Sequence, residues 1–252
     1  MQRYFIPTNY DEHDRASIEV AGEIFHHMIR VMRMKIGEQV YLVFNQKHTV
    51  VAEITTVAEE QAFLKEVREV AWETELPVRV SLFCGFPKGD KLELITQKST
   101  ELGASQVFGF PSKTSVVKWN EKKRLNREQR LNKIAKEAAE QSHRTAFPTV
   151  RLLETQKELF EELSAFDHIL VAYEEAAKKG ERSQLIQTLQ QVRKGERLAF
   201  VFGPEGGLSP DEVALLEEAG GKVCSLGPRI LRTETAPFYA LSAVSFQLEM
   251  LN

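Results

Sequence analysis

Apolar and polar residues alternate over short runs through the first 72 residues of the chain. Alternation with a period of two is typical of strands that bury one face. The pattern predicts a helix over residues 22–32 and strands over residues 3–6, 17–20, 39–44, 50–56 and 63–70. Short strands at this spacing favour a small, mostly antiparallel β-barrel.

Beyond residue 75 the period changes, and strands alternate with helices to the end of the chain. The polar segment 71–77 ends in proline, so we interpret it as a linker between a domain over residues 1–72 and another over residues 76–252. Predicted strands cover 78–84, 106–110, 150–153, 168–173, 198–202 and 222–226, and predicted helices cover 88–103, 121–142, 157–165, 183–192, 210–219 and 236–251. This alternation indicates an α/β domain whose parallel sheet has helices on both faces.

Composition adds limits to this picture. The chain has 252 residues, 42% of them hydrophobic, which is enough for one large domain or two ordinary ones. Its first residues do not resemble a signal peptide and no apolar run is long enough to span a membrane, so we expect a soluble, cytoplasmic protein. Cys84 and Cys224 fall within predicted strands and lack C-x-x-C spacing, which favours buried free thiols. The histidines lack metal-ligand spacing, and we predict no metal site.

Two glycine-rich loops follow the last two predicted strands. Residues 203–207 are G-P-E-G-G, and residues 226–229 are L-G-P-R. Between them Ser209 and Glu212, with Pro210 at the first helical position, form a capping box. Loops at the carboxyl ends of parallel strands commonly bind a ligand. Phosphate-binding glycine motifs are absent and Glu205 would repel a pyrophosphate, so we expect an adenine-like ligand held by backbone groups.

Positive charge is concentrated between residues 113 and 151, although the net charge of the chain is −3. Four acidic residues stand there against eleven basic ones, namely Lys113, Lys118, Lys122, Lys123, Arg124, Arg127, Arg130, Lys133, Lys136, Arg144 and Arg151. Such an excess is typical of a surface that contacts a phosphate backbone. The alternative is a solvated helix face stabilised by ion pairs.

The two glycine loops resemble the cofactor-binding region of a known class. Residues 203–213 (GPEGGLSPDEV) and 225–236 (SLGPRILRTETA) are similar to the SPOUT class of S-adenosylmethionine-dependent RNA methyltransferases, in particular the family that methylates N3 of a uridine in small-subunit (16S) ribosomal RNA. The likeness covers essentially the whole chain, because RYF at 3–5, HHMIRVMRMKIG at 26–37, KGDKLELITQKSTELGA at 88–104 and EQSHR at 140–144 also resemble that family.

This resemblance implies the architecture and the partners of the protein. It implies a PUA-like N-terminal domain that helps to hold RNA, and a C-terminal trefoil knot in which residues 230–235 pass through an earlier loop. It further implies S-adenosylmethionine as the cofactor, small-subunit ribosomal RNA within the ribosomal subunit as the partner, and a homodimer. The final predicted helix is apolar on all sides, which fits burial either within its own domain or against a second copy.

The resemblance also assigns site residues. Cofactor contacts fall on Gly203, Pro204, Glu205, Gly206, Gly207, Leu226, Gly227, Ile230, Leu231 and Arg232. We expect Tyr173 and Glu174, at the end of the preceding strand, to complete the pocket, the alternative being that residues 174–175 form a solvated loop. We predict RNA contacts at Arg3, His26, Arg30, Arg33, Lys35 and Arg144, because no acidic residue lies between Glu23 and Glu38 and because the family places Arg144 near substrate; the alternative for residues 22–32 is an ordinary exposed helix. His26, Arg30 and Arg33 are spaced i, i+4, i+7, so we expect them on one helix face. Arg144 could instead be a cation that satisfies the end of a helix.

Methyl transfer to uridine N3 requires that its proton leaves and that negative charge on the base is stabilised. We expect Arg232, or its neighbour Arg229, to stabilise the charge, and Glu234 either to accept the proton or to serve as a structural ion-pair partner. Two other functions stay open: a non-catalytic RNA-binding factor of the same fold, and an α/β enzyme acting on a small adenine-containing metabolite.

Overall fold

The computed structural model describes residues 1–178, 181 and 183–251, and it describes residues 14, 177 and 178 by their backbone alone. The chain forms two compact units. The first comprises Met1–Glu75 and Ala139–Ala146, and the second comprises Leu76–Ala138 and Phe147–Asn252. The segment 139–146 thus belongs to the first unit, although nothing in its local pattern indicates this.

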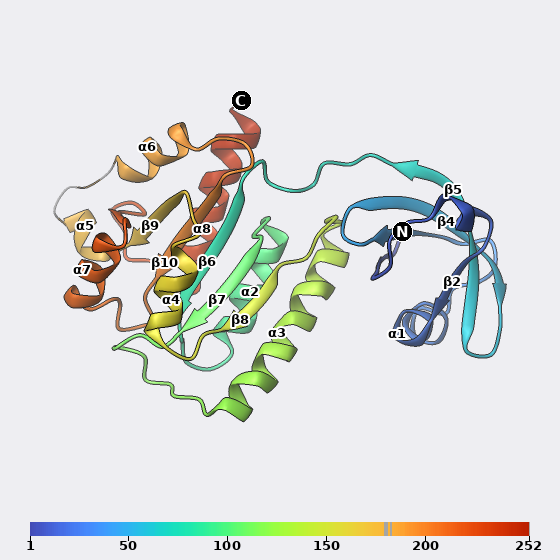
Figure 1. The fold of residues 1–252 in the computed structure, drawn as a ribbon, viewed down its shortest axis with the longest axis horizontal. Coiled ribbons are helices and arrows are strands. Elements are labelled where there is room, and N and C mark those ends of the chain that lie inside the picture. The colour runs from blue at the N-terminus through green and yellow to red at the C-terminus, as the bar shows by residue number, and fades with distance from the viewer. Residues whose placement is uncertain (179–180, 182, 252) are drawn as a thin grey trace. The chain divides into compact units, whose positions relative to one another are not determined.

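The first unit is built on a five-stranded sheet in the order β1-β3-β4-β5-β2 (Figure 1). Its strands are β1 (Arg3–Ile6), β2 (Ile18–Ala21), β3 (Gln39–Phe44), β4 (His48–Val57) and β5 (Gln61–Val70). The pairing of β1 with β3 is parallel and the other pairs are antiparallel. Two register shifts between β4 and β5 bend the sheet around a core that includes Leu42, Ile54 and Leu64. The mostly antiparallel arrangement predicted for this region is confirmed.

One helical segment packs against this core, and its geometry corrects a prediction. The α-helix α1 (Gly22–Phe25) continues as a π-helix, η2 (His26–Val31), and a short 3-10 helix, η1 (Glu12–Ala16), precedes β2. A π-helix bonds each residue to the fifth one before it, so i, i+4, i+7 spacing no longer keeps to one face. Arg33 lies beyond the helix with a positive φ of 54°. The expectation that His26, Arg30 and Arg33 share one helix face is therefore wrong.

The second unit contains a six-stranded sheet in the order β11-β9-β10-β6-β7-β8, with every recorded pair parallel (Figure 1). Its strands are β6 (Arg79–Gly85), β7 (Gln106–Phe110), β8 (Thr149–Leu152), β9 (His168–Ala172), β10 (Arg197–Phe202) and β11 (Lys222–Cys224). Its helices are α2 (Lys91–Glu101), α3 (Glu121–Gln141), α4 (Gln156–Leu163), α5 (Glu174–Lys178), α6 (Gln184–Gln191), α7 (Pro210–Glu218) and α8 (Thr235–Ser245), followed by the π-helix η3 (Phe246–Met250). The predicted parallel α/β fold is confirmed.

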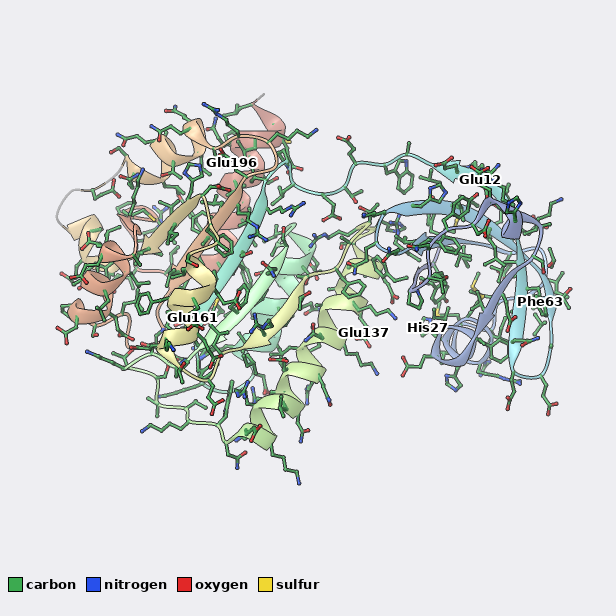
Figure 2. All side chains as sticks on the ribbon, in the orientation of Figure 1. Glu12, His27, Phe63, Glu137, Glu161 and Glu196 are labelled. Carbon is green, nitrogen blue, oxygen red and sulfur yellow. The ribbon has the colours of Figure 1, made fainter. Side chains whose placement is uncertain are left out.

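Alternate side chains of the strands enter two separate cores. In β10, Phe200 and Phe202 pack with residues of α2, α3, α6 and α8, whereas Ala199 and Val201 pack with residues of α4 and α7. Helices therefore cover both faces of the sheet. Exposed carboxylates such as Glu137 on α3 and Glu161 on α4 point away from these cores (Figure 2).

Cys84 and Cys224 are free and buried in this unit, as predicted. Burial raises the pKa of each thiol to about 12, so both stay protonated at neutral pH. Within the described part of the chain no helix is long and apolar enough to cross a membrane. The same residues include no cluster of three or more His, Cys, Asp or Glu side chains suited to a metal ion.

Candidate functional site

Three loops at the carboxyl edge of the second sheet surround one pocket. They follow β9, β10 and β11, which are neighbours in the sheet, so the loops meet at the same edge. The pocket has a volume of about 760 Å³. All twelve residues predicted to contact a cofactor line it: Tyr173, Glu174, Gly203, Pro204, Glu205, Gly206, Gly207, Leu226, Gly227, Ile230, Leu231 and Arg232. Arg229 lines it as well, and Glu234 lies just beyond it.

Glycine is required in these loops because the backbone passes very close to itself. A Cβ on Gly203 would lie 2.5 Å from the carbonyl carbon of Gly207, which is too close for any side chain. Gly207 and Gly227 have φ values of +71° and +98°, in the left-handed region that favours glycine. The bond from Gly207 N–H to the Pro204 carbonyl, 2.8 Å long, closes the turn. In these loops the glycines thus leave the backbone without side chains beside the pocket.

The predicted capping box holds the end of this loop. Ser209 and Glu212 exchange the two expected hydrogen bonds at the start of α7, with Pro210 in the first turn. Glu212 is only 4% exposed and also accepts from the backbone N–H of Lys113 and from Nε2 of Gln156. Burial by itself would raise the pKa of Glu212, but these and further hydrogen bonds to the carboxylate outweigh burial and lower the pKa.

Glu205 faces the start of α2. Its Oε1 accepts from the backbone N–H of Lys88 at 3.0 Å and from Nζ of Lys91 at 2.9 Å. Burial by itself would raise the pKa of Glu205, but the bond from Lys91 and the backbone bonds outweigh burial and lower the pKa. The hydrogen bond that Lys91 donates to Glu205 in turn raises the pKa of Lys91. This carboxylate therefore secures the loop to α2.

Sequence reasoning missed Lys91, which lines the pocket. One signal could have found it: a lysine in the first turn of a helix faces the positive end of the helix dipole, so it needs a nearby carboxylate. Lys91 lies near two carboxylates. The first is Glu205, and the second is Glu234, the residue before α8, whose Oε2 is 3.4 Å from Lys91 Nζ. This Oε2 is buried and has no hydrogen-bond partner among the described residues. The ion pair expected as the alternative role of Glu234 is thus present.

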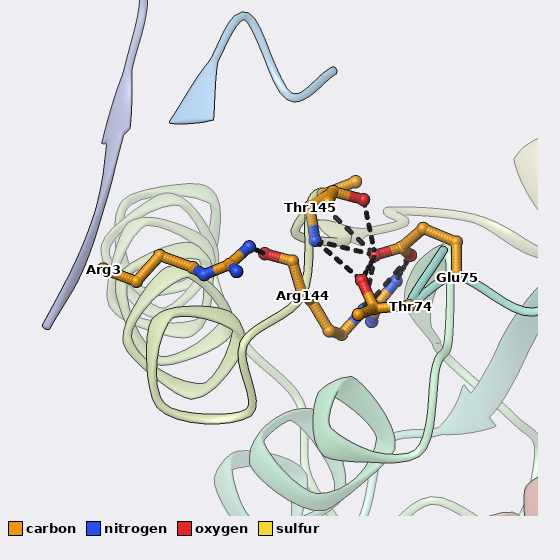
Figure 3. Close-up of polar contacts among 6 residues, drawn as sticks. Arg3, Thr74, Glu75, Arg144 and Thr145 are labelled. Atoms are coloured by element: carbon orange, nitrogen blue, oxygen red, sulfur yellow. Dashed lines mark hydrogen bonds and ion pairs between the residues drawn. The ribbon is translucent and has the colours of Figure 1, made fainter. Parts of the chain in front are cut away.

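Arg3 and Arg144, both predicted to contact RNA, are buried in the first unit (Figure 3). Arg3 Nη1 donates to the Arg144 carbonyl at 2.8 Å, and its guanidinium lies 5.1 Å from the centre of the Tyr41 ring. Arg144 is 3% exposed and donates through Nε and Nη2 to the Glu75 carboxylate. The backbone N–H of Thr145 donates to that carboxylate too. Their burial argues against direct contact with RNA and assigns them to the packing of this unit.

The other predicted RNA residues are exposed. His26, Arg30, Arg33 and Lys35 are all on the surface of the first unit, and Arg30 Nη2 donates to the Glu59 carbonyl at 3.1 Å. Three apolar side chains interleave with them and are also exposed, with fractions of 55% for Val31, 41% for Met32 and 63% for Ile36. The exposed segment 30–36 therefore combines positive charge with apolar surface.

Within the basic region 113–151, the arginines and two lysines, Lys113 and Lys133, are paired. Arg124, Arg130 and Arg151 form ion pairs with Glu154, Glu93 and Glu162, and Lys113 pairs with Asp211. The alternative interpretation, an ion-paired surface, thus holds for these side chains. Lys133 pairs with Glu137 one helical turn away, whereas the partners of Lys113, Arg124 and Arg130 lie at least 30 positions away in sequence. Among the described residues, the members of this region without an ion pair are Lys118, Lys122, Lys123 and Lys136.

Comparison with known proteins agrees with this architecture. Residues 74–245 match the family model described as an RNA methyltransferase domain, and residues 20–67 match the one described as an RNA methyltransferase PUA domain. The match to the methyltransferase domain model covers more than half of the chain and places it in the class of RNA methyltransferases.

The relatives define the family more closely. The chain is 44% identical to the ribosomal RNA small subunit methyltransferase E of Bacillus subtilis, over 100% of this chain and 98% of that protein. It is similar to a Legionella pneumophila protein solved with bound cofactor SAM (27% identity, 96% of both chains, TM-score 0.80). It is also similar to a ribosomal RNA small subunit methyltransferase E of Neisseria gonorrhoeae bound to S-adenosyl methionine (26% identity, 97% of both chains, TM-score 0.78). The chain belongs to the ribosomal RNA small subunit methyltransferase E family.

Proposed function

We propose that this protein transfers the methyl group of S-adenosylmethionine to N3 of a uridine in small-subunit ribosomal RNA. The observation that carries the proposal is the pocket of about 760 Å³ whose wall is formed by the two glycine loops. Membership of the family supports ribosomal RNA as the acceptor, and the cofactor named for two solved relatives supports the methyl donor.

The residues present fit this cofactor. The volume lies within the range of roughly 300–1,000 Å³ that is usual for ligand sites. Gly203 and Gly207 leave backbone groups free to approach the ligand, and a side chain on Gly203 would fill the turn. We assign the loops 203–207 and 226–232 to binding the cofactor, with Tyr173 and Glu174 closing the remaining side.

When bound, S-adenosylmethionine supplies a methyl carbon that is already electrophilic, so the protein chiefly has to align the acceptor nitrogen and manage one proton. Loss of the N3 proton leaves negative charge on the flanking carbonyl oxygens of the base. Arg232 is exposed beside the pocket and forms no ion pair within the described residues, so we assign it to stabilising that charge. We assign the proton to the carboxylate of Glu234, which lies just before α8 and is paired with Lys91.

We infer that RNA is held by the exposed segment 30–36 with His26, and by the unpaired lysines at positions 118, 122, 123 and 136. Cationic side chains that are not neutralised within the protein are those available to neutralise phosphates. We assign the RNA contacts of the first unit to Arg30, Arg33 and Lys35. Arg3 and Arg144 act indirectly, by shaping that unit.

We also propose that the protein acts on ribosomal subunits in the cytoplasm and that its residues 230–235 form part of a trefoil knot. We further propose that the protein is a homodimer formed through its C-terminal helix. The support for the dimer is apolar exposure: Phe246, Met250 and Leu251 are 57%, 73% and 59% exposed in the single chain. Large apolar side chains grouped in this way commonly mark a protein interface.

The test is transfer of labelled methyl from S-adenosylmethionine to small ribosomal subunits, naked ribosomal RNA and free nucleosides, followed by nucleoside analysis. We expect N3-methyluridine in the ribosomal RNA, and its absence from the RNA of cells lacking the protein. If calorimetry detects no binding of S-adenosylmethionine, the protein is a non-catalytic RNA-binding factor. If only small adenine-containing metabolites react, it is a metabolic enzyme.

A further inference from the structure

Lys91 joins two walls of the pocket that are far apart in sequence. It is the first residue of α2 and lines the pocket itself. Its Nζ lies 2.9 Å from Oε1 of Glu205, in the loop after β10, and 3.4 Å from Oε2 of Glu234, just before α8. One cation therefore links the first glycine loop to the segment that carries Arg232 and Glu234.

The surroundings of the three charges show which carboxylate depends more on Lys91. Glu205 also accepts from the backbone N–H of Lys88, so it keeps one donor if the lysine is removed. Among the described residues, Lys91 is the one cation paired with Glu234. The Glu234 side chain is 17% exposed, and the Lys91 and Glu205 side chains are 33% and 28% exposed, so water screens these contacts only in part. Removal of the ammonium would leave two carboxylates beside the pocket without their common partner.

We propose that Lys91 is a positioning residue for cofactor binding and methyl transfer, which holds the loop 203–207 and Glu234 in the arrangement that forms the pocket. This inference rests on the proposed function of the pocket. Lys91 supports the site through the two carboxylates.

If Lys91 positions the loops, its removal should change ligand affinity in the opposite direction from the change expected if Lys91 acts only through its charge. The ammonium of Lys91 repels the positively charged sulfonium of S-adenosylmethionine, so if charge alone mattered, Lys91→Met would tighten binding of that ligand. S-adenosylhomocysteine lacks the sulfonium charge, so this repulsion does not act on it and its binding would not tighten. If Lys91 positions the loops, the same substitution weakens both ligands to a similar extent, because both need the same backbone wall.

Isothermal titration calorimetry with both ligands decides between these results. We expect Lys91→Met to raise the dissociation constants of S-adenosylmethionine and S-adenosylhomocysteine about tenfold or more, and Lys91→Arg to restore most of the affinity, because arginine can also donate to both carboxylates. In methyl-transfer assays, Lys91→Met should raise the KM for S-adenosylmethionine but not for RNA, and should lower kcat because Glu234 is no longer held. Lys98→Met is the matched control, since Lys98 belongs to the same helix and pairs with Glu101.

Wild-type affinities for both ligands in Lys91→Met, or tighter binding of S-adenosylmethionine alone, would overturn the proposal. If Lys91→Met does not fold, Glu205→Gln removes the charge of the same contact from the other side and should weaken both ligands; unchanged affinities in that variant would be equally decisive. If the wild-type protein binds neither ligand, the proposed function of the pocket is refuted. If the wild-type protein binds both ligands and the variant binds them equally well, only the role of Lys91 is refuted.

Discussion

At Gly203 the chain turns so tightly that an added methyl group has no room. A Cβ there would lie 2.5 Å from the Gly207 carbonyl carbon and 2.6 Å from the Leu208 nitrogen, and both neighbours are backbone atoms that cannot rotate away. We therefore expect Gly203→Ala to open the loop and to weaken S-adenosylmethionine binding at least tenfold, as measured by calorimetry.

Gly206→Ala is the milder comparison, because its Cβ would lie 3.0 Å from Thr114 Cβ, a contact that a shift of a few tenths of an ångström relieves. It should weaken binding less. Equal affinities for wild type and Gly203→Ala would show that the loop does not form the wall of the cofactor site.

The carboxylate of Glu212 gives the fold a predictable dependence on pH. The pKa of Glu212 is lower in the folded protein than its ordinary value of 4.5 in the unfolded chain. The charged carboxylate therefore stabilises the fold fully at pH values above 4.5. That stabilisation disappears as the pH falls through the lower pKa of the folded state. Replacing a buried, charged acceptor removes hydrogen bonds worth roughly 1.5–3 kcal/mol.

We expect Glu212→Gln to lower the free energy of unfolding by about 1–3 kcal/mol at pH 7. The difference from wild type should shrink as the pH falls below 4.5. Urea denaturation over a pH series measures both effects. Glu218→Gln, on the exposed face of the same helix, is the control and should leave stability nearly unchanged. A pH-independent difference between Glu212→Gln and wild type would contradict the role given to the charge.

At the scale of elements, the segment after η2 is where the first unit exposes both charge and apolar surface. Arg33 and Lys35 are exposed, and neither forms an ion pair within the described residues. We expect the double substitution Arg33→Gln, Lys35→Gln to weaken binding to small-subunit ribosomal RNA. The slope of log affinity against log salt should become shallower by about one for each phosphate that the variant no longer neutralises.

Fluorescence anisotropy with labelled RNA over a salt series measures this slope. Lys65→Gln is the matched control, because Lys65 is an exposed lysine of β5 in the same unit. A parallel drop of affinity in the control, or an unchanged slope in the double variant, would exclude the segment 30–36 as the RNA-binding surface.

At the scale of the whole molecule, the apolar residues at the end of the C-terminal helix are the basis for the predicted homodimer. Ala240, Leu241 and Val244 are fully buried in the second unit, whereas Phe246 and Met250 lie on the surface. A charge in an apolar interface loses its hydration without a partner. We therefore expect Phe246→Glu to prevent the proposed dimer from forming, so that the variant sediments as a monomer in analytical ultracentrifugation.

Leu215→Glu tests whether any exposed apolar residue has this effect, because Leu215 on α7 is 43% exposed. It should leave the assembly unchanged. Wild-type protein that sediments as a monomer at micromolar concentration would refute the dimer, and a Phe246→Glu variant that stays dimeric would move the interface elsewhere.

Features that depend on neighbours along the chain were determined by the sequence alone. The capping box at Ser209 and Glu212 needs residues three positions apart, and the strands of the second sheet follow from short apolar runs between helical patterns. The two glycine loops were located for the same reason. Local steric limits act within a few residues, so they are visible in the sequence. The knot and the homodimer stay predictions.

Only the tertiary structure decided which distant side chains meet. Lys91 and Glu205 are 114 positions apart, and Arg3 and Arg144 are 141 apart. Whether a cation in a basic or polar segment faces RNA, a carboxylate or a carbonyl depends on the order of strands and on the path between them, which no local pattern specifies. For this reason the sequence located the pocket, whereas the fold revealed the lysine that joins its walls and the burial of two arginines expected at the surface.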